Sequence, residues 1–258
     1  LTIHVGLEEA AEEIRRIARA NPKRTVRVGS GETGDSLLLD PLFGTSAYLI
    51  DALAGEPNLA LELKTKTDLV DHLLDRPVKG NTVIGFSLNP PEVSLPEEGA
   101  AAPVARRLAA AQRAVAAGYR VAFHFDPIIA LPDWQERYGP LLAELAAFPA
   151  DRVAWISLGT IRYTPALREK MDDRPYLLDE FVPGRDGKYR YLQKERVGIY
   201  VNALQVYSDV DDPSAVIGPT FAKVCGDEDN PLVITSGRSM FSRTLQETRK
   251  NLESAGMV

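Results

Sequence analysis

The chain has 258 residues, of which 45% are hydrophobic, and it carries a formal net charge of −6 at pH 7. This length can bury one large α/β domain or two small ones, and the acidic balance argues against a protein that coats nucleic acid nonspecifically, although it allows a local basic groove. The single cysteine, Cys225, excludes a disulfide framework and any zinc or iron–sulfur site built from several cysteines of this chain. No signal peptide is visible and no apolar run approaches the roughly 20 residues of a membrane helix, so we expect a cytoplasmic protein.

Strand-like and helix-like segments alternate along most of the chain, at the spacing of a βα unit, about 30 residues. The expected strands are residues 25–29, 59–64, 82–88, 119–126 and 152–158, and the clearest helices are residues 7–20, 103–117 and 134–148. Most of these strands lack polar alternation, which is typical of parallel strands covered on both faces. The pattern predicts a parallel α/β sheet, open or closed into a barrel, with ligands at the carboxyl ends of its strands.

The first expected strand runs into Gly29-Ser30-Gly31-Glu32, followed by an Asp/Ser/Leu-rich stretch that can start a helix. Glycines at a strand end let a ligand approach the backbone, and a helix N-terminus favours anionic groups. A tight βα turn with no ligand has the same sequence pattern, so the segment alone does not decide between the two interpretations.

Polar and charged side chains stand at the end of every expected strand. They are Ser30, Glu32 and Asp35; Lys64 and Lys66; Ser87 and Asn89; His124 and Asp126; and Ser157, Thr160 and Arg162. Individually, Asp126 before Pro127 can organise a turn, His124 can be a satisfied core histidine, and one of the two lysines can be simply solvated. Five consecutive polar strand ends favour a binding site.

Several motifs occur in a specific order. They are residues 29–36 (Gly-Ser-Gly-Glu-Thr-Gly-Asp-Ser), 63–66 (Leu-Lys-Thr-Lys), 86–92 (Phe-Ser-Leu-Asn-Pro-Pro-Glu), 106–112 (Arg-Arg-Leu-Ala-Ala-Ala-Gln) and 123–129 (Phe-His-Phe-Asp-Pro-Ile-Ile). Together they resemble the spore photoproduct lyase-like group of radical S-adenosylmethionine (AdoMet) proteins, over roughly residues 5–200.

The resemblance implies a partial (β/α)6 radical AdoMet barrel, a variant of the TIM barrel. In this family a [4Fe-4S] cluster, held by a Cys-x-x-x-Cys-x-x-Cys loop after the first strand, binds AdoMet for radical lyase chemistry in DNA repair. The implied cofactor-binding residues are Ser30 and Glu32 near the methionine amino group, Lys66 and Ser87 on its carboxylate and ribose side, and His124 and Asp126 beside the adenosine. A zwitterion needs both an anionic or dipolar partner and a cation, and we expect Glu32, Lys66, Ser87 and Asp126 to converge on one pocket.

Two departures from the family pattern stand out. The first strand and the cluster loop are missing, so we expect them upstream of Leu1, and we expect this chain alone to hold no metal and to be noncatalytic. Glu32 also stands where spore lyases carry a hydrogen-donating cysteine, which points to a substrate other than their thymine dimer. We expect residues 1–178 to form the partial barrel and residues 179–258 an irregular C-terminal extension, in which residues 179–196 are loop-like.

Residues 184–196 interleave bases with aromatic residues where the lyases carry a hairpin that contacts damaged DNA. The predicted nucleic-acid-binding residues are Arg185, Lys188, Tyr189, Arg190 and Tyr191. The alternative is a solvated Asp-Gly hairpin with ordinary surface charge.

The sequence therefore predicts an AdoMet-binding protein whose full-length form performs radical lyase or repair chemistry on nucleic acid. The alternative is a cluster-free, noncatalytic barrel that binds a nucleotide-like ligand or DNA. A metal-dependent hydrolase is disfavoured because His4, His72 and His124 do not form ligand spacings. Cys225 is a buried thiol or a hydrogen donor, and neither the oligomeric state nor the role of residues 229–258 follows from the sequence.

Overall fold

The computed structural model describes residues 6–30, 34–171, 174, 178, 180–184, 186–196 and 198–199, and only the backbone of residues 221–224 and 233–234. The chain divides into two compact units, and each is described by itself. Unit 1 comprises Leu1–Ser87 and Ala100–Phe123, and unit 2 comprises Leu88–Gly99 and His124–Val258. This division falls inside the expected barrel part, and the expected boundary at residue 178 stays a prediction.

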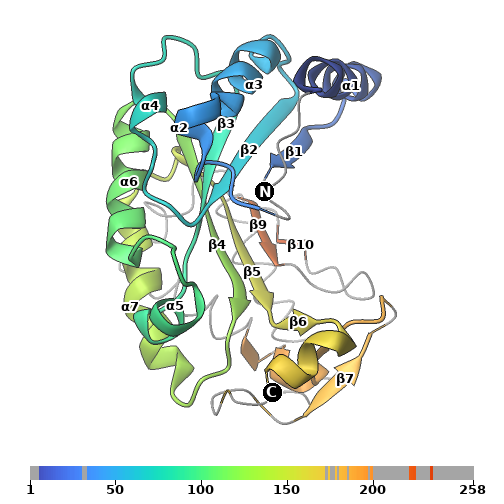
Figure 1. Ribbon diagram of the computed structural model, residues 1–258, viewed down its shortest axis with the longest axis vertical. Helices are drawn as coiled ribbons and strands as arrows, with labels where there is room; N and C mark the ends of the chain where they lie inside the picture. Colours follow the sequence, from blue (N-terminus) through green and yellow to red (C-terminus); the bar gives the residue numbers. More distant parts are fainter. Residues whose placement is uncertain are drawn as a thin grey trace. The chain divides into compact units, whose positions relative to one another are not determined.

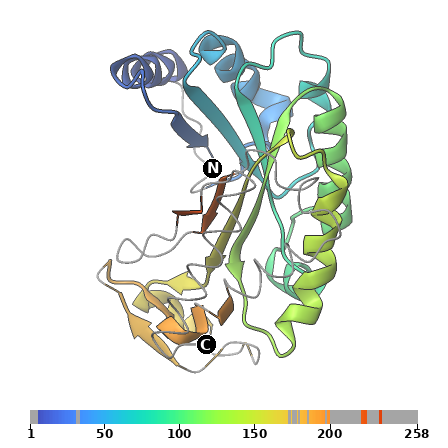
Figure 2. The same cartoon turned by 180° about the vertical axis from the view of Figure 1, so that it is seen from behind.

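Unit 1 is built on parallel strands. Strand β1 (Val26–Ser30) pairs in parallel with β2 (Leu59–Thr65), and β2 pairs in parallel with β3 (Thr82–Ser87). Figure 1 shows these strands side by side, and Figure 2 shows them from behind. The helices of this unit are α1 (Leu7–Ala20), α2 (Asp40–Phe43), α3 (Thr45–Leu53), α4 (Asp71–Leu74) and α6 (Val104–Ala116).

The strands of unit 1 carry different side chains on their two faces. Helices α1, α3 and α6 pack against β1, β2 and β3, respectively. The buried Leu61 and Leu63 of β2 alternate with Glu62 and Lys64, and side chains of neighbouring strands that are in register point to the same face. The apolar set therefore forms the core under the helices, and the charged residues of β2 lie on the opposite face.

Unit 2 contains α5 (Pro91–Glu97), the end of β4 (Arg120–Ile128), α7 (Trp134–Glu144), the 3-10 helix η1 (Leu145–Ala147) and β5 (Val153–Thr160). Its strand order is β4-β5-β9-β10, where β9 is Phe221–Val224 and β10 is Val233–Ile234. Strand β9 pairs in parallel with β5, and β10 pairs in antiparallel fashion with β9.

A second, three-stranded antiparallel sheet completes unit 2, in the order β6-β8-β7. Its strands are β6 (Arg162–Tyr163), β7 (Phe181–Pro183) and β8 (Tyr189–Tyr191), with the 3-10 helix η2 (Pro165–Lys170) after β6. Residues 179–196, expected to be loop-like, thus contain two short strands. Their turn uses Gly187 at a φ of 75°, a backbone conformation that glycine adopts without strain.

The five expected strands and the three expected helices are confirmed, with shifts of one or two residues at most strand ends. The third helix, expected over residues 134–148, is α-helical only up to Glu144, and the 3-10 helix η1 follows it. The sequence analysis did not predict α2, α3, α4 or α5. Helices α2 and α4 have four residues each, which are too few to show a helical period. Within the described residues, no helix combines the length and the apolar character needed to cross a membrane.

Candidate functional site

The predicted site begins at the end of β1. Ser30 Oγ donates a hydrogen bond to the Glu62 carbonyl oxygen at 3.2 Å, and it lies 2.8 Å from Ser36 Oγ. A hydroxyl has one proton, so the Ser36 hydroxyl donates to Ser30. These bonds tie Ser36 to the end of β1 and the end of β1 to β2. Glu32 lies outside the described residues, and its cofactor role stays a prediction.

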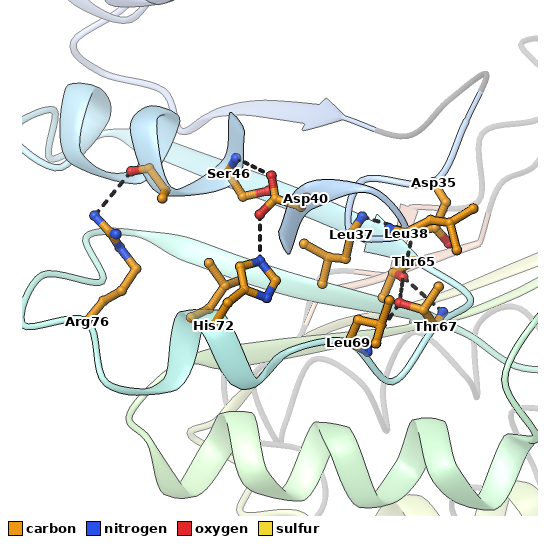
Figure 3. A network of polar contacts seen from close by, with 12 residues as sticks. Asp35, Leu37, Leu38, Asp40, Ser46, Thr65, Thr67, Leu69, His72 and Arg76 are labelled. Carbon is orange, nitrogen blue, oxygen red and sulfur yellow. Dashed lines mark hydrogen bonds and ion pairs between the residues drawn. The ribbon is translucent and has the colours of Figure 1, made fainter. Parts of the chain in front are cut away.

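Asp35 joins the residues that lead into α2 to the end of β2 (Figure 3). Its Oδ1 accepts hydrogen bonds from Leu37 N at 2.9 Å, Leu38 N at 3.0 Å and Thr65 Oγ1 at 2.7 Å. Its Oδ2 accepts one from Lys66 N at 2.6 Å. One carboxylate therefore fixes two segments that lie 30 residues apart in the chain.

The two other predicted residues of unit 1 follow adjacent strands. Thr65 is in register with Phe86, so the next residues, Lys66 and Ser87, stand at neighbouring strand ends, about 5 Å apart in the pairing direction. Ser87 is 3% exposed, and its carbonyl oxygen accepts a hydrogen bond from Arg107 Nη1 at 2.8 Å. The parallel register thus brings the ends of β2 and β3 to one edge.

Arg107 is an organising residue that the sequence pattern did not single out. It is 1% exposed, and its Nε also donates to the Ala102 carbonyl oxygen at 2.6 Å. The helical stripe of α6 places Arg107 off the apolar face and suggests a solvated charge. Instead, the guanidinium of Arg107 donates to the carbonyl oxygen of Ser87, at the end of β3, and to that of Ala102, just before α6.

A second unexpected element is the ion pair between Arg27 and Glu62. Glu62 Oε2 accepts hydrogen bonds from Arg27 Nε at 3.0 Å and Nη2 at 2.5 Å, and Glu62 is 3% exposed. Gly29 stands opposite Glu62 in the register, and a methyl group there would lie 3.4 Å from Oε2. The signal in the sequence is a single glutamate inside an apolar strand, because a buried carboxylate needs a partner.

In unit 2, His124 and Asp126 both belong to β4. His124 is 4% exposed, and its carbonyl oxygen accepts a hydrogen bond from Leu88 N at 2.8 Å. Asp126 lies against Gly159, where a Cβ would come within 2.5 Å of Asp126 Oδ1. Gly159 therefore makes room for this carboxylate, whose Oδ2 is 4.0 Å from Arg162 Nη2. Convergence of these residues with those of unit 1 on one pocket stays a prediction.

The predicted nucleic-acid segment forms the β7–β8 hairpin, and its side chains differ sharply in exposure. Lys188 is exposed and Tyr189 is half-buried, whereas Arg190 is 5% exposed and Tyr191 is fully buried. Arg185 lies outside the described residues. The arrangement therefore leaves Lys188 and Tyr189 accessible to a ligand, and it does not support direct contacts from Arg190 or Tyr191.

The Arg190 side chain packs against the turn of the hairpin. Its guanidinium forms an ion pair with Asp186 and lies against Gly184, where a side chain would overlap it. Asp186 Oδ1 also accepts the Lys188 amide at 3.1 Å. This amide, together with the charge of Arg190, lowers the pKa of Asp186 below its usual value.

Tyr191 belongs to an aromatic cluster on the other face of this sheet, formed by Tyr163, Phe181, Tyr189 and Tyr191. The rings of Phe181 and Tyr191 stack with centroids 5.2 Å apart, and those of Tyr163 and Tyr189 stack at 5.8 Å. Tyr191 Oη accepts a hydrogen bond from Ala130 N at 3.3 Å, and burial raises the pKa of Tyr191 to about 12. The cluster anchors the hairpin by packing.

The residues described by the structure contain no group of three or more His, Cys, Asp or Glu side chains that could hold a metal ion. Cys225 lies outside these residues, and the sequence holds no second cysteine. A [4Fe-4S] cluster needs several thiolates, so the residues of this chain do not fit one.

The parallel strands, their helices and the polar strand ends define an α/β protein of the partial radical AdoMet barrel type, which confirms the expected fold class. A solved structure of spore photoproduct lyase, a cysteine-to-alanine mutant, has the same fold, with a TM-score of 0.72 and 25% identity over 82% of this chain and 66% of that one. The family model for spore photoproduct lyase matches residues 1–175, so the chain belongs to the spore photoproduct lyase family.

Two curated relatives are spore photoproduct lyases. That of Bacillus subtilis (strain 168) is 31% identical over 226 residues, which are 83% of this chain and 66% of the relative. That of Geobacillus sp. (strain Y412MC61) is 27% identical over 146 residues, covering 57% of this chain and 43% of the relative. The chain thus spans just under two thirds of the length of the Bacillus relative.

A further solved structure shows a spore photoproduct lyase mutant with bound AdoMet and dinucleoside spore photoproduct. It matches with a TM-score of 0.72 and 23% identity, and it covers 82% of this chain and 66% of that one.

Proposed function

We propose that this chain is the AdoMet-binding part of a radical AdoMet protein whose complete form performs lyase or repair chemistry on damaged nucleic acid. The observation that carries the proposal is membership of the spore photoproduct lyase family, since the family model spans residues 1–175. A solved relative with bound AdoMet and dinucleoside spore photoproduct supports both the cofactor and the substrate class.

The residues at the strand ends of unit 1 suit the amino-acid end of AdoMet. Lys66 offers a cation for its carboxylate, and Ser30 and Glu32 are the proposed partners of its ammonium group. Ser87 on the next strand is the proposed contact on the ribose side, and His124 and Asp126 are the proposed contacts beside the adenosine. Bound AdoMet would supply the source of the radical, and the side chains of this chain would bind and orient it.

The residues of this chain do not suffice to hold the [4Fe-4S] cluster of the family, because one cysteine in 258 residues cannot supply three thiolates.

The proposed substrate is a nucleic-acid lesion other than the thymine dimer that spore lyases reverse, because the family resemblance places Glu32 where those lyases carry a hydrogen-donating cysteine. The test is to incubate the complete protein, AdoMet and a reductant with oligonucleotides that carry defined photoproducts, and to follow each lesion by mass spectrometry. Loss of one lesion only in the presence of AdoMet supports the proposal. Unchanged lesions across the panel contradict it.

The single cysteine favours a second candidate, a cluster-free and noncatalytic barrel that binds a nucleotide-like ligand or DNA. The same experiment separates the two, since this candidate binds oligonucleotides while AdoMet and every lesion stay intact.

A further inference from the structure

Asp35 connects the residues that lead into α2 with the end of β2, next to the proposed AdoMet ligand Lys66. Its Oδ1 accepts from Leu37 N, Leu38 N and Thr65 Oγ1 (Figure 3). Its Oδ2 accepts from the Lys66 amide, so both oxygens of the carboxylate are used. This arrangement gives Asp35 a role in positioning rather than in direct contact with a ligand.

The hydroxyl groups beyond Asp35 form a chain whose direction is fixed. Thr65 Oγ1 donates its only proton to Asp35, so its 2.9 Å contact with Thr67 Oγ1 requires the Thr67 hydroxyl to be the donor. Thr67 Oγ1 in turn accepts Leu69 N at 3.3 Å, and Thr65 Oγ1 accepts Thr67 N at 2.9 Å. Every link ends at the Asp35 carboxylate, which is the acceptor that orders the chain.

This chain of hydroxyls lies at the end of β2, in Leu63-Lys64-Thr65-Lys66-Thr67. Thr65 is 1% exposed and Thr67 is 5% exposed, so both are buried. Lys64 and Lys66 alternate with them in the sequence and are half-buried. The backbone bends at Lys66 and Thr67, and the hydrogen bonds between Thr65 and Thr67 hold this bend, so they fix the backbone from which the Lys66 side chain projects.

We propose that Asp35, acting through Thr65 and the Lys66 amide, is the positioning residue that holds the Lys66 ammonium in place for the carboxylate of AdoMet. The inference rests on the proposed function, because it concerns the same AdoMet site. The contribution of Lys66 to AdoMet binding then depends on the Asp35 carboxylate. Removing that carboxylate weakens the contact from Lys66 even though Asp35 does not touch the cofactor.

The test is a double-mutant cycle on AdoMet affinity, measured by equilibrium dialysis with the complete protein under anaerobic conditions. The variants are Asp35→Asn, Lys66→Ala and the double variant, because Asn keeps the size but loses the charge and one acceptor. Loss of a hydrogen bond to a charged acceptor is expected to weaken AdoMet binding by at least about tenfold in Asp35→Asn. In the Lys66→Ala background, the same substitution is expected to change affinity by less than about threefold.

One further pair of variants and one single variant serve as controls for folding. Thr65→Val removes the hydroxyl and is expected to resemble Asp35→Asn, whereas Thr65→Ser keeps the hydroxyl and is expected to retain affinity. Asp71→Asn changes an exposed carboxylate whose Oδ1 forms an ion pair with Arg113 Nε at 3.2 Å. This substitution is expected to leave the affinity for AdoMet unchanged.

The outcomes separate the two claims. If the unmodified complete protein does not bind AdoMet, the proposed function fails. If it binds and the effects of Asp35→Asn and Lys66→Ala simply multiply, Asp35 is a general structural residue and the inference is overturned. Should Asp35→Asn not fold, equal affinities for Thr65→Val and Thr65→Ser overturn it as well.

Discussion

The hairpin offers a sharp test, because Arg190 and Lys188 lie two residues apart and the structure gives them opposite roles. Arg190 is 5% exposed, packs on Gly184 and pairs with Asp186, whereas Lys188 is exposed. We predict that Arg190→Ala destabilises the fold and that Lys188→Ala weakens the attraction to phosphate.

The magnitudes follow from these positions. Truncating a buried arginine removes the packing of its stem and is expected to cost about 1–3 kcal/mol of unfolding free energy. The midpoint of thermal unfolding should then fall by roughly 2–4 °C per kcal/mol. Lys188→Ala should stay within about 0.5 kcal/mol, as exposed substitutions do.

Binding of a duplex oligonucleotide to the complete protein at several salt concentrations gives the second readout. A lost phosphate contact flattens the plot of log affinity against log salt by about one unit, so Lys188→Ala should flatten it and Arg190→Ala should not. Lys170→Ala, another exposed lysine of unit 2, serves as the control and should leave the slope unchanged. A flattened slope with unaltered stability for Arg190→Ala would refute the reasoning.

Three further predictions concern stability and metal content. Tyr119 is 1% exposed, and its hydroxyl donates to the Leu73 carbonyl oxygen at 2.9 Å. Tyr119→Phe should therefore lower the free energy of unfolding, measured in urea, by about 1–3 kcal/mol. Tyr48→Phe, which removes a hydroxyl without a described partner, should lower it by less than about 0.5 kcal/mol. Burial raises the pKa of Tyr191 from 10.0 to about 12, so the folded state keeps a proton that the unfolded chain loses. The contribution of Tyr191 to the unfolding free energy is fully present below pH 10 and should be lost from pH 10 to 12, by up to about 1.4 kcal/mol per pH unit. Tyr191→Phe should make the decline shallower by that amount and leave the part due to Tyr119 and Tyr138, because burial raises the pKa of both. Anaerobic reconstitution of the 258-residue chain should give no stoichiometric four-iron cluster by iron and sulfide analysis, and four irons per chain would contradict the cysteine argument.

The sequence predicts the strands well because hydrophobic runs and their spacing are local signals. Residues 59–64 and 82–88 read as buried strands, and the structure has β2 and β3 within one residue of these bounds. Parallel pairing is expected from the overall alternation of strand-like and helix-like segments, and it brings Lys66 and Ser87 to one edge.

Side-chain partners are harder to predict because they depend on contacts across the sheet. The sequence marks Asp35 only as one polar residue at a strand end, whereas its donors come from Thr65 and Lys66, 30 and 31 residues further on. Arg190 reads as a surface base beside tyrosines, and only the close approach of Gly184 and Asp186 shows that it is internal. A buried charge with a partner and a solvated charge look alike in a sequence.

The central claim is that this chain belongs to a protein that uses AdoMet to act on damaged nucleic acid. The most direct test is to quantify 5′-deoxyadenosine formed by the complete protein from AdoMet under reducing, anaerobic conditions, with and without ultraviolet-irradiated DNA. The account predicts that 5′-deoxyadenosine forms, that irradiated DNA increases its amount, and that Lys66→Ala abolishes the increase. Intact AdoMet in the presence of irradiated DNA, with the DNA nevertheless bound, would contradict the account and support a noncatalytic binding protein.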